Sequence, residues 1–203
     1  MIIPSPKSIY TYLFTAFGIL VIFPVFASAE LVPLDVKDSS LTFIGEATLH
    51  KFRGEAKEFT GKAELNKNAV PPIRSATLHF RTAALTTFLP ERDQKMREWL
   101  KVKVHPEATF YLQRVKLLSG KLETASASRP AKFAVSGTFI LNGVKRPLAG
   151  TALAWRQGNR VIVTGQTMLN TLNYGLPRIK QAMVMTVGTH VEITYRFSFV
   201  IAW

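Results

Sequence analysis

The side chains that could do chemistry are few and scattered along the chain. Four histidines, His50, His79, His105 and His190, include no pair at the spacing of two metal ligands on one helix or in one loop. The chain has no cysteine, which excludes disulfides, thiolate metal sites and a cysteine nucleophile. Ser136 stands in VSGT and not in a Gly-x-Ser-x-Gly elbow. The sequence therefore favours surface or structural histidines, although ligands from separate strands could still assemble a zinc site.

Two carboxylates, Glu91 and Asp93, stand at the start of the one segment with helical periodicity. Residues 90–101, PERDQKMREWLK, space their apolar side chains three and four apart (Met96, Trp99 and Leu100), which predicts an amphipathic helix of about three turns. Carboxylates at a helix start interact favourably with the helix dipole, and we interpret both that way in preference to an acid–base pair. Trp99 is expected to point at a sheet or at its open end.

The clearest strand signal is a hairpin over residues 132–155, KFAVSGTFILNGVKRPLAGTALAW. Two runs that favour strands flank Asn142-Gly143, a pair that suits a two-residue type I′ turn. In the first run the odd positions are mostly apolar, and small or polar residues stand between them. One face of this hairpin is therefore expected to be buried.

Strand patterns account for most of the remaining chain, and no second helix pattern alternates with them. Glycines inside residues 52–65 predict bulges or tight bends, and a change of phase near Arg114 predicts another bulge. With the hairpin there are about eight strands, which predicts one all-β domain, an antiparallel barrel or sandwich. The other strand segments are residues 32–50, 52–65, 73–85, 107–118, 160–169 and 187–201.

The first 29 residues have the pattern of a cleaved signal peptide. Lys7 precedes a mostly apolar run, and Ala27-Ser28-Ala29 fits a cleavage site before Glu30. A retained membrane anchor is the alternative, but the apolar run is shorter than the roughly 20 residues that a spanning helix needs. We expect an exported protein whose mature domain covers residues 30–203.

The chain is strongly basic, with 26 Lys and Arg against 13 Asp and Glu and a pI near 10.2. Such a surface favours anionic partners such as a membrane surface or lipid phosphates, although it can also attract counter-ions unspecifically. The basic residues are spread over many strands and form no single cluster, so we expect no nucleic-acid partner.

Inward-facing phenylalanines recur on several of the expected strands. They could line a tunnel for an apolar ligand, or they could fill the core, since an eight-stranded barrel is just wide enough for either. These residues are Phe43, Phe80, Phe110, Phe139 and Phe197.

Three ordered motifs give essentially the whole mature chain a resemblance to the YceI-like, or polyisoprenoid-binding-like, family. RDQKMREWLKVKVHPEATF resembles the family's Arg-Asp-x-His-Leu and Tyr-Pro-x-x-x-Phe segments, FAVSGTFILNGVKRPL its Gly-Val-x-Lys-Pro hairpin, and NTLNYGLP with VGTHVEI its last two motifs. The resemblance implies a lipocalin-like, extended antiparallel barrel, exported by bacteria, whose tunnel holds an isoprenoid or similar amphiphile. Where the family has histidine in Arg-Asp-x-His, this chain has Lys95, a fixed positive charge that would suit a phosphate.

Together these observations predict a periplasmic, non-enzymatic protein that sequesters or carries a long-chain amphiphile and needs no cofactor. Strand phase and the resemblance predict the lining residues Phe43, Leu78, Phe80, Phe110, Leu112, Phe139, Val191, Ile193 and Tyr195. Residues on or beside the helix are expected at the mouth, near an anionic head: Arg92, Lys95, Arg97 and Trp99. Two alternatives remain open, a structural or stress-related envelope barrel with a filled core, and an enzyme acting on a lipid with a titratable group in its interior.

Overall fold

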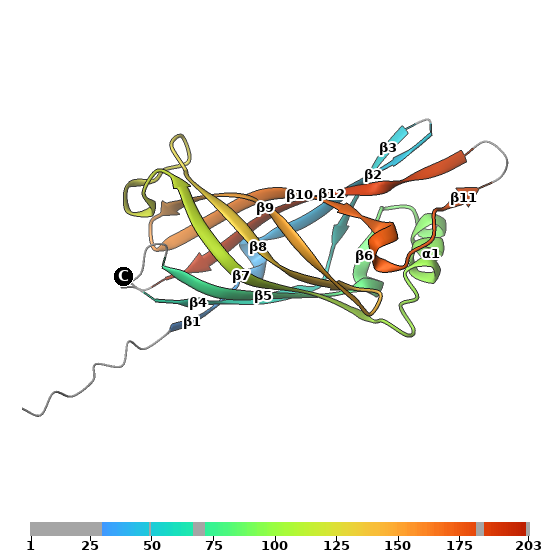
Figure 1. Ribbon diagram of the computed structural model, residues 1–203, viewed down its shortest axis with the longest axis horizontal. Helices are drawn as coiled ribbons and strands as arrows, with labels where there is room; N and C mark the ends of the chain where they lie inside the picture. Colours follow the sequence, from blue (N-terminus) through green and yellow to red (C-terminus); the bar gives the residue numbers. More distant parts are fainter. Residues whose placement is uncertain (1–29, 49, 67–71, 182–184, 202–203) are drawn as a thin grey trace, which may run out of the picture.

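The described part of the chain folds into one strongly curled antiparallel sheet with a single α-helix at one end (Figure 1). The computed structural model describes residues 30–48, 50–66, 72–181 and 185–201, so the expected signal peptide, residues 1–29, lies outside the described residues. In the part of the chain so described, no helix has the length and apolar character needed to cross a bilayer.

The strands are more numerous than the eight expected. In the described ranges there are twelve, in the spatial order β1-β4-β5-β7-β8-β9-β10-β12-β2-β3-β6, with β11 paired to β12. Their bounds are β1 (Glu30–Pro33), β2 (Ser40–Ala47), β3 (His50–Ala56), β4 (Phe59–Leu65), β5 (Ile73–Arg81), β6 (Leu85–Thr86), β7 (Glu107–Ser119), β8 (Ala131–Leu141), β9 (Val144–Gln157), β10 (Arg160–Asn170), β11 (Lys180–Gln181) and β12 (Met185–Val200). The expected strands 32–50 and 52–65 each divide in two, and β6 and β11 are too short to show a period-two pattern.

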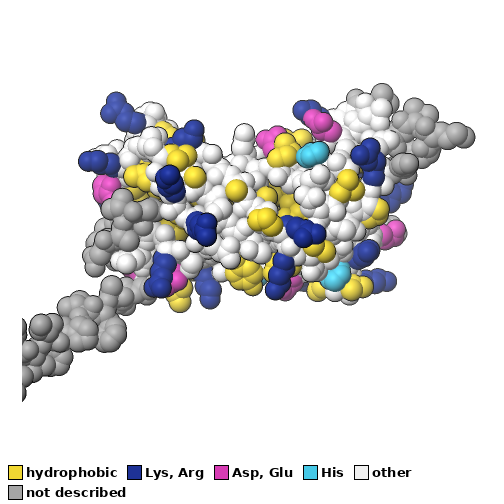
Figure 2. Space-filling model, viewed as in Figure 1, with side chains coloured by type: hydrophobic (Ala, Val, Ile, Leu, Met, Phe, Trp, Pro, Cys, Tyr) yellow, Lys and Arg dark blue, Asp and Glu magenta, His cyan; other side chains and the backbone are white. Residues whose placement is uncertain are grey.

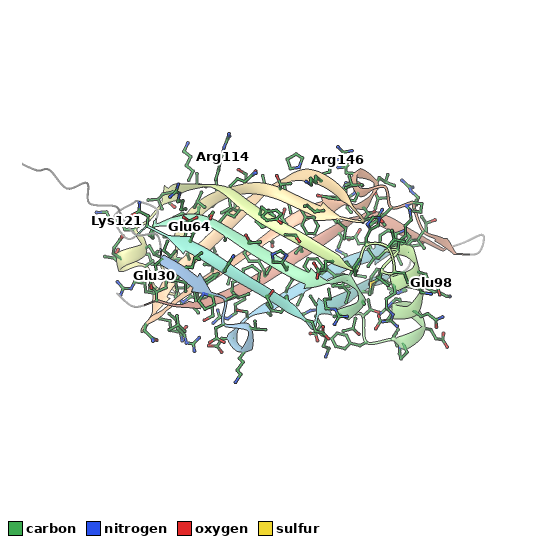
Figure 3. All side chains as sticks on the ribbon, turned by 90° about the horizontal axis from the view of Figure 1, so that it is seen from below. Glu30, Glu64, Glu98, Arg114, Lys121 and Arg146 are labelled. Atoms are coloured by element: carbon green, nitrogen blue, oxygen red, sulfur yellow. The ribbon has the colours of Figure 1, made fainter. Side chains whose placement is uncertain are left out.

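Three local features that the sequence predicted, a turn, a bulge and a helix, are confirmed. Asn142 and Gly143 have φ angles of 50° and 73°, as the two central residues of a type I′ turn require. The register of β7 on β8 shifts between Leu112 and Arg114, which is the predicted bulge. Helix α1 (Pro90–Trp99) lies where the change of period placed a helix. Arg114 points away from the sheet, as does Arg146 (Figure 3).

The glycines that were predicted to mark bulges or bends, Gly54 in β3 and Gly61 in β4, lie in continuous register with their neighbours, so neither marks a bulge. Gly54 is paired across the strands with Phe43, and Gly45 of β2 is paired in the same way with Phe52. The rings lie over the glycines so closely that a Cβ at Gly54 would stand 2.2 Å from the Phe43 ring. Glycine is required here because an aromatic ring occupies the space of its side chain.

The sheet curls until β1, at one edge, meets β12, which is not its neighbour in the strand order. Just after β1, Leu34 forms a bridge with Phe199 of β12, and its N–H donates to the carbonyl of Gly61 in β4. Farther along, the N–H of Lys57 donates to the carbonyl of Ala84 in η2 (Thr82–Ala84), which joins β5 to β6. These contacts draw both edges of the sheet around one interior.

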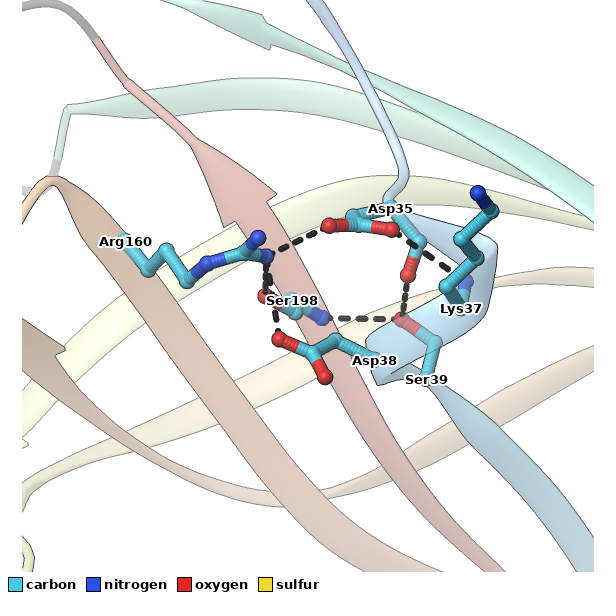
Figure 4. A network of polar contacts seen from close by, with 6 residues as sticks. All are labelled: Asp35, Lys37, Asp38, Ser39, Arg160 and Ser198. Atoms are coloured by element: carbon cyan, nitrogen blue, oxygen red, sulfur yellow. Dashed lines mark hydrogen bonds and ion pairs between the residues drawn. The ribbon is translucent and has the colours of Figure 1, made fainter.

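A polar network fastens the connection between β1 and β2 to the outside of the sheet (Figure 4). The 3-10 helix η1 (Val36–Asp38) is capped by Asp35, whose carboxylate accepts from Arg160 at 2.5 Å. Arg160 also contacts Asp38 at 3.1 Å and donates to Ser198 at 3.0 Å. The side-chain hydrogen bond from Arg160 holds the pKa of Asp35 below its usual value of 3.8.

We expect Arg160→Ala to lower the midpoint of denaturant unfolding, because two carboxylates would lose the same partner. Arg160→Lys should recover part of the loss, since an ammonium supplies charge but not the planar donor fork. Urea titrations followed by tryptophan fluorescence would measure both variants. A midpoint for Arg160→Ala equal to the wild-type value would show that the network contributes nothing.

Candidate functional site

The curled sheet encloses a cavity of about 610 Å³. This volume lies within the range of roughly 300–1,000 Å³ found for sites that bind small molecules. Aliphatic and aromatic side chains from β2, β5, β7, β8 and β12 form most of its wall. All nine residues predicted to line a tunnel stand on this wall: Phe43, Leu78, Phe80, Phe110, Leu112, Phe139, Val191, Ile193 and Tyr195.

Alternation along the strands explains why these side chains converge. On β5, Ala76, Leu78 and Phe80 line the cavity. His79, between Leu78 and Phe80, does not line it and forms a hydrogen bond with the Thr109 hydroxyl at 3.0 Å. The bulge at Leu112–Arg114 lets Val115 resume the inward phase on β7. The apolar wall therefore stays continuous along β7, because the residue inserted at the bulge restores the alternation of inward and outward side chains.

One end of the cavity is filled by a buried apolar cluster, here called the floor. It lies where β1, η3 (Leu122–Thr124) and the end of β12 meet. Leu122, Phe133 and Val163 belong to it or pack against it and also line the cavity. Its buried members are Val32, Ala63, Leu65, Leu122, Ala125, Ala131, Phe133, Ala154, Val161 and Ile201.

Aromatic rings form two groups along the wall. Phe139 stacks on Phe80 with ring centroids 6.2 Å apart and meets Tyr174 edge-on at 5.6 Å. Tyr195 stacks on Phe197 at 5.0 Å. Offset or edge-on ring pairs add stability beyond their buried area, so they keep the wall rigid around a space that is not filled.

Tyr195 is the one tyrosine among the described residues that line the cavity. Burial raises its pKa to about 12, so the phenol is neutral at physiological pH. Gly165 on β10 makes room for it, because a Cβ there would stand 2.3 Å from the hydroxyl oxygen. The group is therefore a neutral hydrogen-bonding group in apolar surroundings.

Helix α1 lies at one end of the curled sheet (Figure 1), and its residues line the other end of the cavity, here called the mouth. Its inner side presents Arg92, Lys95, Met96 and Trp99 to the cavity, so the face that points inward is mixed rather than purely apolar. The indole N–H of Trp99 donates to the carbonyl of Pro177 at 2.8 Å and ties the helix to the segment after η4 (Thr171–Tyr174). Arg97, predicted for the mouth, does not line the cavity.

A buried network centred on Asp93 holds the helix to β6. The carboxylate, only 6% exposed, accepts from the Thr87 N–H at 2.7 Å, from the Thr87 hydroxyl at 2.5 Å and from the Thr86 hydroxyl at 2.7 Å. Burial by itself raises the pKa of Asp93, but the hydrogen bonds from Thr87 and Thr86 and the charge of Arg97 outweigh it, and the pKa lies below 3.8.

The same threonine positions Arg92. The Nε of Arg92 donates to the Thr87 hydroxyl at 2.7 Å, and its Nη2 donates to the Thr87 carbonyl at 2.8 Å. The guanidinium lies 5.0 Å from the centre of the Phe52 ring. Arg92 is thus fixed at the mouth by contacts within the protein. Lys95 makes no hydrogen bond or ion pair with the described residues and is exposed, so its ammonium is free to meet a ligand.

The ionisable groups on the described part of the mouth are basic. Sequence reasoning missed two of them, His50 on β3 and Arg178 in the segment before β11, which also line the cavity. Among the described residues no Asp or Glu lines it, and none of the His, Asp and Glu side chains groups into a set of three that could hold a metal. The surface outside the cavity is basic as well, with Lys and Arg spread over the visible face (Figure 2).

Comparison with known proteins places this geometry in a family. Residues 33–199 match the family model of the YceI-like domain, and no curated protein sequence matches the chain. BcnA of Burkholderia cenocepacia is 15% identical, with a TM-score of 0.68 over 81% of this chain and 98% of that chain. A polyisoprenoid binding domain from Saccharophagus degradans, implicated in plant cell wall breakdown, is 15% identical, with a TM-score of 0.65 over 86% and 100%. A Campylobacter jejuni YCEI protein is 12% identical, with a TM-score of 0.54 over 64% and 74%.

Proposed function

The chain belongs to the YceI-like domain family, and from this premise we propose that it binds a long-chain amphiphile, with the tail in the cavity and an anionic head at the mouth. The observation that carries the proposal is the asymmetry of the cavity, which has an apolar wall, a floor of apolar side chains and cations at the opposite end. One similar structure is a polyisoprenoid binding domain, which makes an isoprenoid the first ligand class to test.

The affinity of such a site comes from partition of the tail out of water. Each buried methylene contributes about 0.8 kcal/mol, so a tail of some ten methylenes contributes about 8 kcal/mol before the cost of association is subtracted. Specificity then depends on the head. A structural barrel with a filled core, the alternative from the sequence, does not fit a cavity of about 610 Å³.

The direct experiment is native mass spectrometry of protein purified from its own cell envelope, with extraction and identification of any bound lipid. We expect an adduct whose mass matches an amphiphile with an acidic head, released by organic solvent. Protein that carries no lipid and takes up neither isoprenoid phosphates nor fatty acids would contradict the proposal.

Charge reversal at Lys95 tests the position of the head. Lys95→Glu should weaken binding of an anionic amphiphile about tenfold, because an attractive charge at the mouth becomes a repulsive one, and should leave a neutral alcohol of the same tail length unaffected. Lys37→Glu, on exposed η1 away from the mouth, makes the same change of net charge. Equal effects of the two variants would show that only overall charge matters. Fluorescent-lipid displacement at low salt measures both.

We also propose that the mature protein is exported to the periplasm and begins at Glu30. The apolar run and the small residues before Glu30 support this assignment. N-terminal sequencing of protein from a periplasmic extract should read Glu-Leu-Val-Pro. A start at Met1, or recovery only from the cytoplasm, would contradict it.

A further inference from the structure

Large apolar side chains protrude from the protein beside the mouth. Phe88 and Leu89, directly before α1, are 59% and 54% exposed, and Val104, just beyond the helix, is 70% exposed. Together they are three of the most exposed large hydrophobic residues in the described chain. Scattered single residues of this kind need no explanation, but an aromatic–aliphatic pair on a cavity rim does.

The backbone at Phe88 is held in an unfavourable conformation that keeps the pair exposed. Its φ of 64° lies in the left-handed region, which a bulky residue rarely adopts. The N–H of Phe88 donates at 3.0 Å to the Thr86 hydroxyl, and that hydroxyl donates to buried Asp93. The network that anchors α1 therefore also imposes the turn that presents Phe88 to solvent.

Cations outnumber carboxylates in the segment that carries the protruding pair. Residues 88–105 contain five Lys or Arg against three acidic residues, and one of the three, Asp93, is buried. Lys95, Lys101 and Lys103 are exposed there, as are the carboxylates Glu91 and Glu98. The ammonium of Lys57, which also pairs with Glu55, lies 5.6 Å from the centre of the Phe88 ring.

We propose that the mouth docks on an anionic bilayer surface, with Phe88 and Leu89 inserted at the boundary between head groups and acyl chains and the lysines held at the phosphates. Apolar and aromatic tips with long basic side chains beside them are the composition of an interfacial anchor, and each cation near an anionic surface strengthens binding about fivefold. Charge complementarity favours this occupant over a protein partner. The proposal goes beyond ligand binding in the cavity, because it assigns the surface through which cargo would be exchanged.

The test is flotation of the purified protein with vesicles of phosphatidylcholine alone or with about 30% phosphatidylglycerol. We expect binding to the anionic vesicles that weakens as salt is raised. The double variant Phe88→Ser/Leu89→Ser should bind at least tenfold more weakly. The matched control is Leu31→Ser/Leu118→Ser, which removes two exposed leucines on β1 and at the end of β7, near the floor, and should bind like the wild type. No cargo is needed, so the result is independent of the binding function.

A second variant separates lost docking from lost folding. Phe88→Gly relieves the left-handed strain, so its melting temperature should rise by roughly 2–4 °C while vesicle binding falls. Equal binding to neutral and anionic vesicles, or undiminished binding by the double variant, would overturn the proposal. Capture of a protein through Phe88 and Leu89 without vesicle binding would overturn it as well.

Discussion

Replacing Ala76 by tryptophan is expected to weaken binding of long-tailed amphiphiles at least tenfold and to spare short-tailed ones. Ala76 is on β5, between Ala63 of β4 and Leu112 of β7, and its methyl group lines the cavity beside the floor. An indole there would occupy the space that the end of a long tail needs. We expect the dissociation constant to rise at least tenfold for tails that reach this depth, since each methylene kept in water forfeits about 0.8 kcal/mol.

Displacement assays with a homologous series of tail lengths would measure this change. Ala134→Trp on β8 is the matched control, because Ala134 alternates outward between Phe133 and Val135, which line the cavity. It should leave every tail length unaffected. If Ala76→Trp weakened short and long tails alike, the tail would not extend toward the floor.

Removing the Asp93 carboxylate is expected to have the largest effect on stability. Asp93→Ala leaves a buried N–H and two hydroxyls without their acceptor, and Arg92 loses the orientation of its partner Thr87. We expect a loss of about 2–4 kcal/mol in the free energy of unfolding. Glu91→Gln, which changes an exposed carboxylate two residues before Asp93, should change the free energy of unfolding little. Urea titration at neutral pH compares the two.

The pH dependence of the same group has a definite sign. Because its pKa is lowered on folding, ionised Asp93 stabilises the protein fully above its unfolded pKa near 3.8, and this contribution disappears as the pH falls through the lower folded pKa. Wild type and Asp93→Asn should therefore differ most at neutral pH and converge below about pH 4. A difference that stayed constant down to pH 2 would mean that the carboxylate is not the stabilising species.

Sequence patterns were sufficient for features that depend on neighbours along the chain. The type I′ turn at Asn142-Gly143, the bulge near Arg114 and the helix after Leu89 all follow from local propensity and period. The inward phase of the strands placed nine side chains around the cavity. The strand number was wrong for two reasons. Two expected strands each divide in two, and the short strands β6 and β11 are set by their pairing partners and not by their own two-residue sequences.

The composition of the mouth was harder to predict, because its residues come from segments that are distant in the sequence. Trp99 and Arg178 both line the cavity although they lie far apart in the sequence. Trp99 bonds to Pro177, which is 78 positions away. Thr87 was also missed, because the sequence does not show that this threonine is buried and links Arg92 to Asp93. The roles of Gly45 and Gly54 depend on which phenylalanine faces them across the strands, which a single strand does not reveal.

The floor gives the proposed cargo a direction. An amphiphile lying lengthwise must enter tail first and leave head first, so loading and unloading would use the same doorway in succession. A carrier of this kind cannot act as a conduit between a donor and an acceptor that it touches at once. It must detach from one and reorient before it serves the other.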